Sequence, residues 1–112
     1  MLQLNPVVKQ IFVNLPVKDL QRSIDFFTGL GFRFNPQFTD DKAACMVISE
    51  TIYAMLIVES FFKTFTNKKI SDAAKSTEVL NALSFESRAK VDEMADKALK
   101  SGGSPNTETQ YH

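Results

Sequence analysis

Few side chains in this 112-residue sequence are of the types that catalyse reactions. The single histidine, His112, is the last residue, so chemistry that needs an internal imidazole, including a Ser-His-Asp triad, is not expected on this chain alone. The single cysteine, Cys45, lies among Ala44, Met46 and Val47 with no neighbouring cation to activate its thiol, so we expect a small buried hydrophobe. One cysteine forbids an intrachain disulfide and suits a reducing compartment, which predicts a cytoplasmic protein.

The charged residues are also arranged without an obvious catalytic pattern. Asp40 and Asp41 predict a turn, because paired carboxylates do acid–base chemistry only when a cleft holds them. A run of lysines after residue 60 has two readings that the sequence leaves open, a solvated loop or a local anion-binding patch. These lysines are Lys63, Lys68, Lys69 and Lys75.

Composition limits the classes of protein that remain. The chain is 44% hydrophobic and 23% charged, which are ordinary globular values. Thirteen Lys and Arg balance thirteen Asp and Glu, so no overall field favours nucleic acid or an acidic membrane as a partner. No apolar run approaches the roughly 20 residues of a membrane span, and no signal peptide is evident. The unusual excess is aromatic, with ten Phe, two Tyr and no Trp.

The first 31 residues carry the clearest local pattern, a strand followed by a helix. Residues 10–17 alternate as a strand does, with Ile11, Val13, Leu15 and Val17 on one face. Asp19 is a good N-cap for the helix, and Gly31 suits a left-handed C-terminal cap. The apolar stripe of the predicted helix is Leu20, Ile24, Phe27 and Leu30.

Three further strands are predicted without another helix between them, at residues 32–38, 43–49 and 52–59. The polar breaks between them are typical of an antiparallel meander. Residues 61–77 then form a long, basic connection with an aromatic cluster of Phe61, Phe62 and Phe65.

The strand–helix pattern returns after the connection. Residues 79–85 are apolar and strand-like, and Ser87 can cap a helix that ends at Gly102-Gly103. Glu93 with Lys97 and Asp96 with Lys100 are i,i+4 ion pairs on its polar face. The apolar stripe consists of Val91, Met94, Ala95, Ala98 and Leu99.

Residues 15–32 resemble the opening of vicinal-oxygen-chelate proteins, a superfamily that includes glyoxalase I, extradiol dioxygenases and the bleomycin- and fosfomycin-resistance proteins. Residues 77–87, with the helix and Gly-Gly that follow, look like the start of the family's second module. The closest subgroup is the one labelled predicted lactoylglutathione lyases, whose Phe-Phe-Lys-Thr-Phe-like stretch is similar to residues 61–65. The residues that fit the opening signature are Val17, Asp19, Leu20, Ser23, Phe26, Phe27, Leu30, Gly31 and Phe32.

The resemblance implies an α+β fold built from a repeated βαβββ module, the glyoxalase/bleomycin-resistance/dioxygenase fold. Residues 1–112 would form a single domain, with the first module at 9–60, a connection at 61–76 and a partial second module (strand, helix, tail) at 77–112. Three further strands would be expected after His112, so the second module is predicted to be incomplete.

The resemblance also places the family's metal ligands, on the first and fourth strands of each module. The matching positions fall at Phe12, Leu56 and Leu80, whose side chains have no lone pair to give a cation. The expectation is therefore no metal and no cofactor. Glu59 would offer a carboxylate only if the register of the fourth strand were shifted, and otherwise it is a solvated charge at a strand end.

A ligand pocket is expected on the concave face of the sheet. Asn14 has the same strand parity as Phe12, and its amide either binds a ligand or is solvated by water. The phenylalanines of the connection are placed near the rim, where aromatic side chains line ligand pockets. The predicted pocket residues are Phe12, Asn14, Leu56, Leu80, Phe62 and Phe65.

Three functions remain open at this stage. The first is a metal-free protein that binds a small apolar or aromatic molecule. The second is a metal-dependent lyase or dioxygenase of the same superfamily. The third is a structural role, in which the incomplete module only dimerises. A homodimer is expected in each case, because unpaired strand edges and apolar surface are usually hidden by association.

Overall fold

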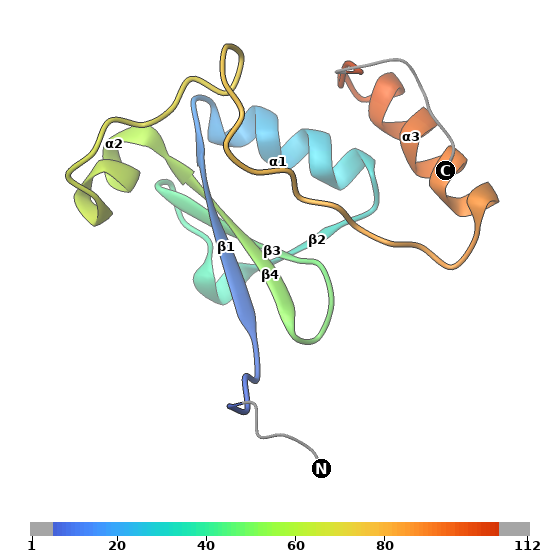
Figure 1. Cartoon of the computed structure of the whole chain (residues 1–112), viewed down its shortest axis with the longest axis horizontal. Helices are drawn as coiled ribbons and strands as arrows, with labels where there is room; N and C mark the ends of the chain where they lie inside the picture. The colour runs from blue at the N-terminus through green and yellow to red at the C-terminus, as the bar shows by residue number, and fades with distance from the viewer. Residues whose placement is uncertain (1–5, 106–112) are drawn as a thin grey trace.

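The computed structural model describes residues 6–105, and Figure 1 shows how their elements are arranged. The expectations for His112 and for the rest of the tail after residue 105 lie outside the described residues. A four-stranded sheet with one long helix occupies the first half of the chain. The second half contributes two short helical turns, a connection and a second long helix that lies beyond the end of the first (Figure 1).

The sheet has the strand order β1-β4-β3-β2. The first and last strands of the module, β1 and β4, pair in parallel, whereas β4–β3 and β3–β2 are antiparallel. The predicted strand–helix–meander order is therefore confirmed, and the fold class is α+β. The strands are β1 (Ile11–Val17), β2 (Arg33–Asn35), β3 (Ala43–Val47) and β4 (Ile52–Val58).

The third predicted element is shorter than expected. A strand was predicted over residues 32–38, but β2 ends at Asn35 and the chain turns into a 3-10 helix, η1 (Pro36–Phe38). Pro36 lacks the N–H that a ladder needs, and the Asn35 side chain accepts from the Gln37 amide at 3.0 Å. These two local preferences end the strand.

The predicted turn at Asp40-Asp41 is confirmed. The Asp40 carboxylate accepts hydrogen bonds from the backbone N–H groups of Lys42 (2.8 Å) and Ala43 (3.0 Å). These two bonds hold the pKa of Asp40 below its usual value, and the Lys42 charge adds to the effect.

Helix α1 (Leu20–Gly29) forms as the sequence predicts. The Asp19 side chain caps it by accepting from the Arg22 amide at 3.1 Å, and Gly31 takes the left-handed conformation at φ +100°. The apolar stripe of the helix packs on the sheet around a core of Leu20, Ala44 and Leu56. The partly buried side chains around that core are Leu15, Val17, Ile24, Phe27, Phe34 and Val58.

The strand register defines which side chains share each face of the sheet. Leu15 on β1 lies opposite Leu56 on β4, and both belong to the face that α1 covers. Asn14 lies opposite Met55, and because side chains alternate along a strand, this pair belongs to the other face. We call this other face the concave face.

Strand β1 is an edge strand, hydrogen-bonded to β4 on one side only. This position explains how Pro16 is accommodated within it, since an edge strand tolerates a residue without an N–H. Ile11 and Phe12 are 51% and 46% exposed at the start of this edge. The edge therefore presents both free backbone groups and apolar side chains.

The strand predicted over residues 79–85 is not formed. This segment has no regular secondary structure and pairs with no strand among residues 6–105, and Val79 and Leu80 are 65% and 80% exposed. Its apolar residues indicated a strand, but a strand is stable only when a neighbour satisfies its backbone groups. In Figure 1 the connection runs past α1 and crosses β2 in the view without joining the sheet.

Helix α3 (Arg88–Lys100) has the predicted cap and ion pairs. Ser87 accepts from the Lys90 amide at 3.1 Å, and Lys97 and Lys100 pair with Glu93 (3.5 Å) and Asp96 (3.0 Å). No side chain of the helix is buried.

The contact between α3 and α1 lies at their C-terminal ends. A Cβ added to Gly29 would lie 2.6 Å from Ser101 Oγ, and one added to Gly103 would lie 3.1 Å from the Phe26 ring. Close approach at these two glycines is what brings the helices together. No helix within residues 6–105 is long and apolar enough to cross a membrane.

Candidate functional site

A cavity of about 360 Å³ lies between the concave face of the sheet and the segment that follows β4. That segment consists of a short helix, α2 (Glu59–Phe62), and a 3-10 turn, η2 (Lys63–Phe65). The sequence predicted a strand to Glu59 and then a connection, so these two turns were missed. The cavity is lined by Asn14, Ala43, Met55, Ile57, Phe61, Phe62, Phe65 and Thr66.

The aromatic wall of the cavity is ordered by local contacts. Phe61 and Phe65 are one helical turn apart, and their rings meet edge to face with centroids at 5.0 Å. The Thr64 hydroxyl donates to the Phe61 carbonyl at 2.7 Å, which tightens the turn. Lys42 Nζ lies 5.7 Å from the centre of the Phe61 ring, within the range of a cation–π contact.

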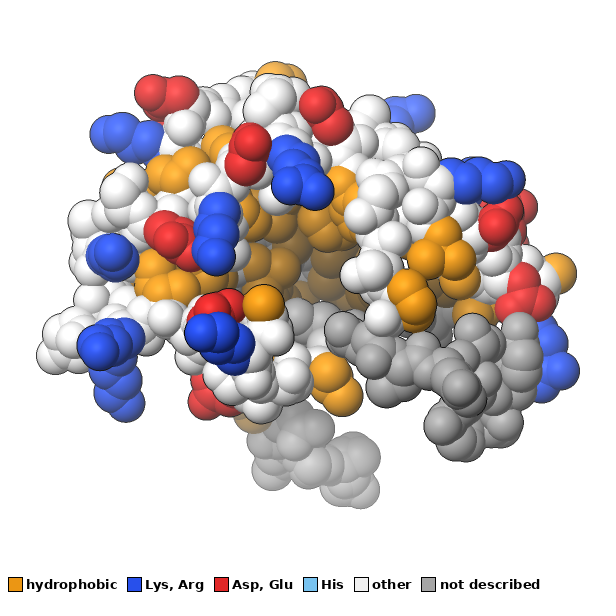
Figure 2. Space-filling view, turned by 90° about the horizontal axis from the view of Figure 1, so that it is seen from above, with side chains coloured by type: hydrophobic (Ala, Val, Ile, Leu, Met, Phe, Trp, Pro, Cys, Tyr) orange, Lys and Arg blue, Asp and Glu red, His pale blue; other side chains and the backbone are white. Residues whose placement is uncertain are grey.

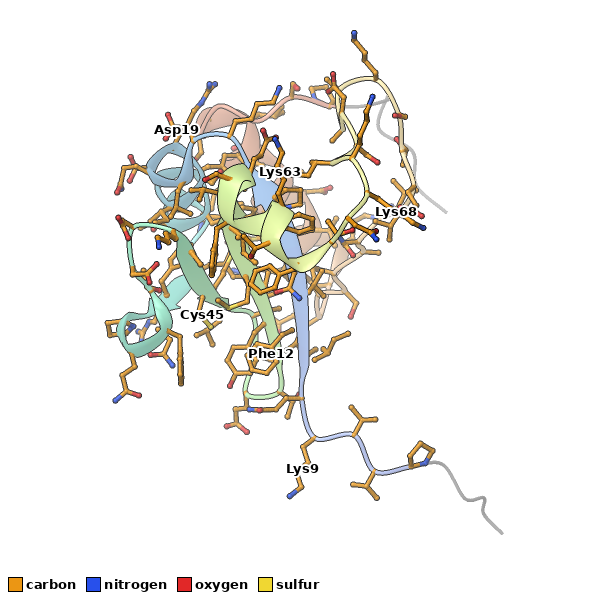
Figure 3. The ribbon with its side chains drawn as sticks, turned by 90° about the vertical axis from the view of Figure 1, so that its left-hand side faces the viewer. Lys9, Phe12, Asp19, Cys45, Lys63 and Lys68 are labelled. Carbon is orange, nitrogen blue, oxygen red and sulfur yellow. The ribbon has the colours of Figure 1, made fainter. Side chains whose placement is uncertain are left out.

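A second aromatic pair lies on the same face, further towards the start of β1. Phe12 and Tyr53 are partners in the β1–β4 register and stack with centroids 4.7 Å apart and planes inclined by 11°. The Tyr53 hydroxyl donates to the Glu50 carbonyl at 2.9 Å, which fixes the ring. Figure 3 shows Phe12 at the opposite end of the sheet from Lys63. The concave face is therefore aromatic at both ends.

The row between the two aromatic ends is Asn14, Met55 and Cys45, one residue from each of three adjacent strands. Asn14 is exposed and its side chain makes no hydrogen bond to the described residues. Cys45 is 1% exposed, and burial raises the pKa of its thiol. The prediction that Cys45 behaves as a small buried hydrophobe is confirmed.

Three of the predicted pocket residues come together in this cavity, namely Asn14, Phe62 and Phe65. Phe12 lies on the same face but stacks on Tyr53 and does not line the cavity. Leu80 is 80% exposed on the unpaired segment and lies with none of the others.

The prediction that Leu56 belongs to the concave face is wrong. Leu56 is 1% exposed and packs under α1 with Leu20 and Ala44, on the side of the sheet away from the cavity. The concave positions of β4 are Tyr53, Met55 and Ile57 instead. Because β4 is apolar on both faces, its sequence does not show which residues belong to the concave face. The hydroxyl of Tyr53 was the one signal in that strand that could have indicated the exposed side.

The described residues do not fit a metal centre of the kind that the resemblance implies. Between the two aromatic ends, the concave row offers an amide, a thioether and a thiol, without an imidazole or a carboxylate. Within residues 6–105, no three His, Cys, Asp or Glu side chains lie close enough together to hold an ion. Glu59, the one carboxylate considered, is the first residue of α2 and lines a different cavity.

That second cavity, of about 790 Å³, lies on the face of the sheet that α1 covers. We call it the helix-side cavity. Its floor is apolar and includes Leu15, Val17, Phe27 and Leu56. Figure 2 looks into a hollow with an apolar floor and charged side chains of both signs at its rim. The two cavities are thus on opposite faces of the same sheet.

Comparisons with known proteins bear on the fold. A family model described as bleomycin resistance protein-like N-terminal matches residues 9–49, which span β1 to the end of β3. A solved structure, hypothetical protein SA1046 from S. aureus, is 26% identical with a TM-score of 0.77, and the match covers 96% of this chain and 80% of that one.

A second solved structure is a glyoxalase/bleomycin resistance protein/dioxygenase family enzyme from Burkholderia phytofirmans PsJN. It is 12% identical with a TM-score of 0.58, and the match covers 81% of this chain and 71% of that one. The chain has the glyoxalase/bleomycin-resistance fold. No curated protein matches it. The family model and the fold support the superfamily, and neither distinguishes its subgroups.

Proposed function

We propose that this glyoxalase/bleomycin-resistance-fold protein binds a small, uncharged aromatic or apolar molecule on its concave face, without a metal ion. The observation that carries the proposal is the aromatic cavity between the sheet and α2–η2. Its volume of about 360 Å³ is at the small end of the range for ligand pockets, which favours a ligand of one or two rings.

The lining of the cavity supports an uncharged ligand. Phe61, Phe62 and Phe65 supply apolar and aromatic contacts, and no charged side chain is among the lining residues. Asn14 provides one amide that can both donate and accept, which is enough to orient a ligand with a single polar group. A charged ligand would lose its hydration here without gaining a partner.

The lyase and dioxygenase alternatives need a metal ion with at least two good ligands. The concave face carries no carboxylate or imidazole at the positions described above, so these alternatives gain no support from residues 6–105. The lactoylglutathione lyase subgroup remains a resemblance of sequence. We therefore favour binding over catalysis.

Titration with indole tests the binding proposal. The chain has no Trp, so with excitation at wavelengths beyond the tyrosine absorption band the fluorescence comes from indole alone. We expect binding that weakens about 3- to 10-fold in Phe65→Ala, since an aromatic pair contributes about 0.5–1.5 kcal/mol. Phe38→Ala is the matched control, because Phe38 (63% exposed) and Phe65 (65% exposed) are equally accessible and Phe38 does not line the cavity.

Two outcomes would contradict the proposal. The first is an absence of indole binding at millimolar concentration by a protein whose circular dichroism shows it to be folded. The second is an equal loss of affinity in Phe38→Ala and Phe65→Ala, which would indicate general adsorption to exposed rings.

We also propose that the protein is a homodimer in which a second copy covers the edge formed by β1. The edge is seven residues long, its outward-facing backbone groups have no strand partner among residues 6–105, and it exposes Ile11 and Phe12. Covering such an edge removes both a pairing liability and apolar surface. A net charge of zero offers little repulsion against self-association.

Light scattering at micromolar concentration should then report about twice the chain mass of 12.6 kDa. Phe12→Asp is expected to shift the mass towards that of a monomer, and Phe38→Asp serves as the control on an equally apolar exposed ring. A monomer in the unchanged protein, or a dimer that Phe12→Asp leaves intact, would contradict this use of the edge.

A further inference from the structure

The helix-side cavity has an apolar floor that α1 leaves open. Helix α1 packs on the core of Leu20, Ala44 and Leu56, but Leu15 and Val17 on the edge strand are only partly buried. Together with Phe27 and Leu56 they form one side of a cavity of about 790 Å³. The opposite wall is the connection from Lys69 to Ala74. An apolar surface of this kind favours a hydrocarbon or aromatic occupant.

Three lysines from three different segments line the same cavity. Lys18 follows β1, Lys63 begins η2, and Lys69 lies in the connection. The ion pairs formed within residues 6–105 all lie along α3, so none of these lysines is neutralised by one. The sequence left the lysines after residue 60 open between a solvated loop and an anion-binding patch. The fold brings two of them to one cavity and adds a third, Lys18, from far away in the sequence.

The acidic groups of the cavity do not cancel this charge. Glu59 and Asp72 also line it, and Asp72 Oδ1 already accepts a hydrogen bond from the Ala74 amide at 3.0 Å. Three lysines against two carboxylates leave an excess of one positive charge (3 − 2 = 1) in a chain whose net charge is zero. The excess is local, so it comes from the fold and not from composition.

We propose that the helix-side cavity is a second ligand site, which takes a small amphipathic carboxylate: an acyl or aryl chain on the apolar floor, with its anionic group among Lys18, Lys63 and Lys69. A purely polar anion would leave the floor in contact with water, and a neutral hydrocarbon would leave the lysines without a partner. Only a ligand with both parts uses both features. The site is on the opposite face from the concave cavity, and the proposal does not rest on the function proposed there.

Calorimetric titration with octanoate tests this site, with octanamide as the uncharged probe of equal length. We expect octanoate to bind more tightly than octanamide at low salt, and the difference to shrink as salt is added. Lys63→Gln and Lys69→Gln should each weaken octanoate binding about two- to fivefold, the range for an exposed charge pair. Lys68→Gln is the matched control, because Lys68 is adjacent to Lys69 in sequence and is not among the residues that line the cavity.

A parallel NMR titration with octanoate, followed by amide chemical shifts, locates the ligand. The expected changes are centred on Val17 and on residues 69–74, and thermal melting of each lysine variant checks that it is folded. The proposal is overturned if octanamide binds as tightly as octanoate, or if Lys68→Gln weakens binding as much as Lys69→Gln. It is also overturned if the shifts are centred on Asn14 and Met55, or if the folded protein binds no octanoate.

Discussion

Helices α1 and α3 have similar amphipathic patterns but very different surroundings. Both are capped by a side chain that accepts from the third residue on, Asp19 in α1 and Ser87 in α3. The stripe of α1 closes the core of the sheet, whereas no side chain of α3 is buried. The comparison shows that a periodic apolar stripe specifies a helix, and that burial depends on whether a complementary surface is present.

The same contrast separates the strands. Residues 52–58 are apolar and become β4, with β1 and β3 on either side. Residues 79–85 are also apolar, but no strand of the described chain lies beside them and they form no regular secondary structure. Sheet formation is a non-local property, because each backbone group must find its partner on another segment.

Leu56 and Leu80 were both predicted to line the pocket, and their substitutions give the largest expected difference in stability between the two regions. Leu56→Ala should lower the free energy of unfolding by about 2–5 kcal/mol, since it opens a cavity in the core. Leu80→Ala should change it by less than about 0.5 kcal/mol, because Leu80 is 80% exposed. Urea unfolding followed by circular dichroism measures both. Equal effects would mean that the segment around Leu80 is packed after all.

The two caps give the next largest difference. Asp19→Ala should lower the free energy of unfolding by about 1 kcal/mol, because α1 is part of the cooperative core. Ser87→Ala removes an equivalent hydrogen bond from a helix that buries no side chain, so its effect should be local to α3. Amide hydrogen exchange is then expected to rise in α3 alone. A Ser87→Ala variant that loses as much global stability as Asp19→Ala would contradict the division into two regions.

The smallest expected effect is the pH response of α3. Glu93 accepts a hydrogen bond from Lys90 Nζ at 2.8 Å, and this bond, together with the charges of Lys90 and Lys97, holds the pKa of Glu93 below its ordinary value of 4.5. A carboxyl whose pKa is lowered by folding stabilises the helix above that ordinary value, and the contribution is lost as the pH falls through the lowered pKa. The carboxyl carbon of Glu93, followed by NMR, should titrate at higher pH in Lys90→Gln. An unchanged titration would show that the pair does not form in solution.

The first module was largely predictable because its signals are local. The stripe from Leu20 to Leu30, the cap at Asp19 and the left-handed Gly31 all act within one or two turns of the chain, so the sequence alone indicates them. The turn at Asp40 is of the same kind. The candidate site was predicted in part, since the parity of β1 placed Asn14 on the face that carries the cavity.

What the tertiary structure decided concerns partners that are distant in sequence. The face of Leu56 was set by the register of β4 against β1 and β3, and a strand that is apolar on both sides does not reveal that register. The unpaired state of residues 79–85 was set by the absence of a neighbouring strand within the described chain. Lys18, Lys63 and Lys69 line one cavity because β4 is parallel to β1, so that the two strands end at the same edge of the sheet. Composition fixed the number of charges, and only folding gathered three of them around an apolar floor.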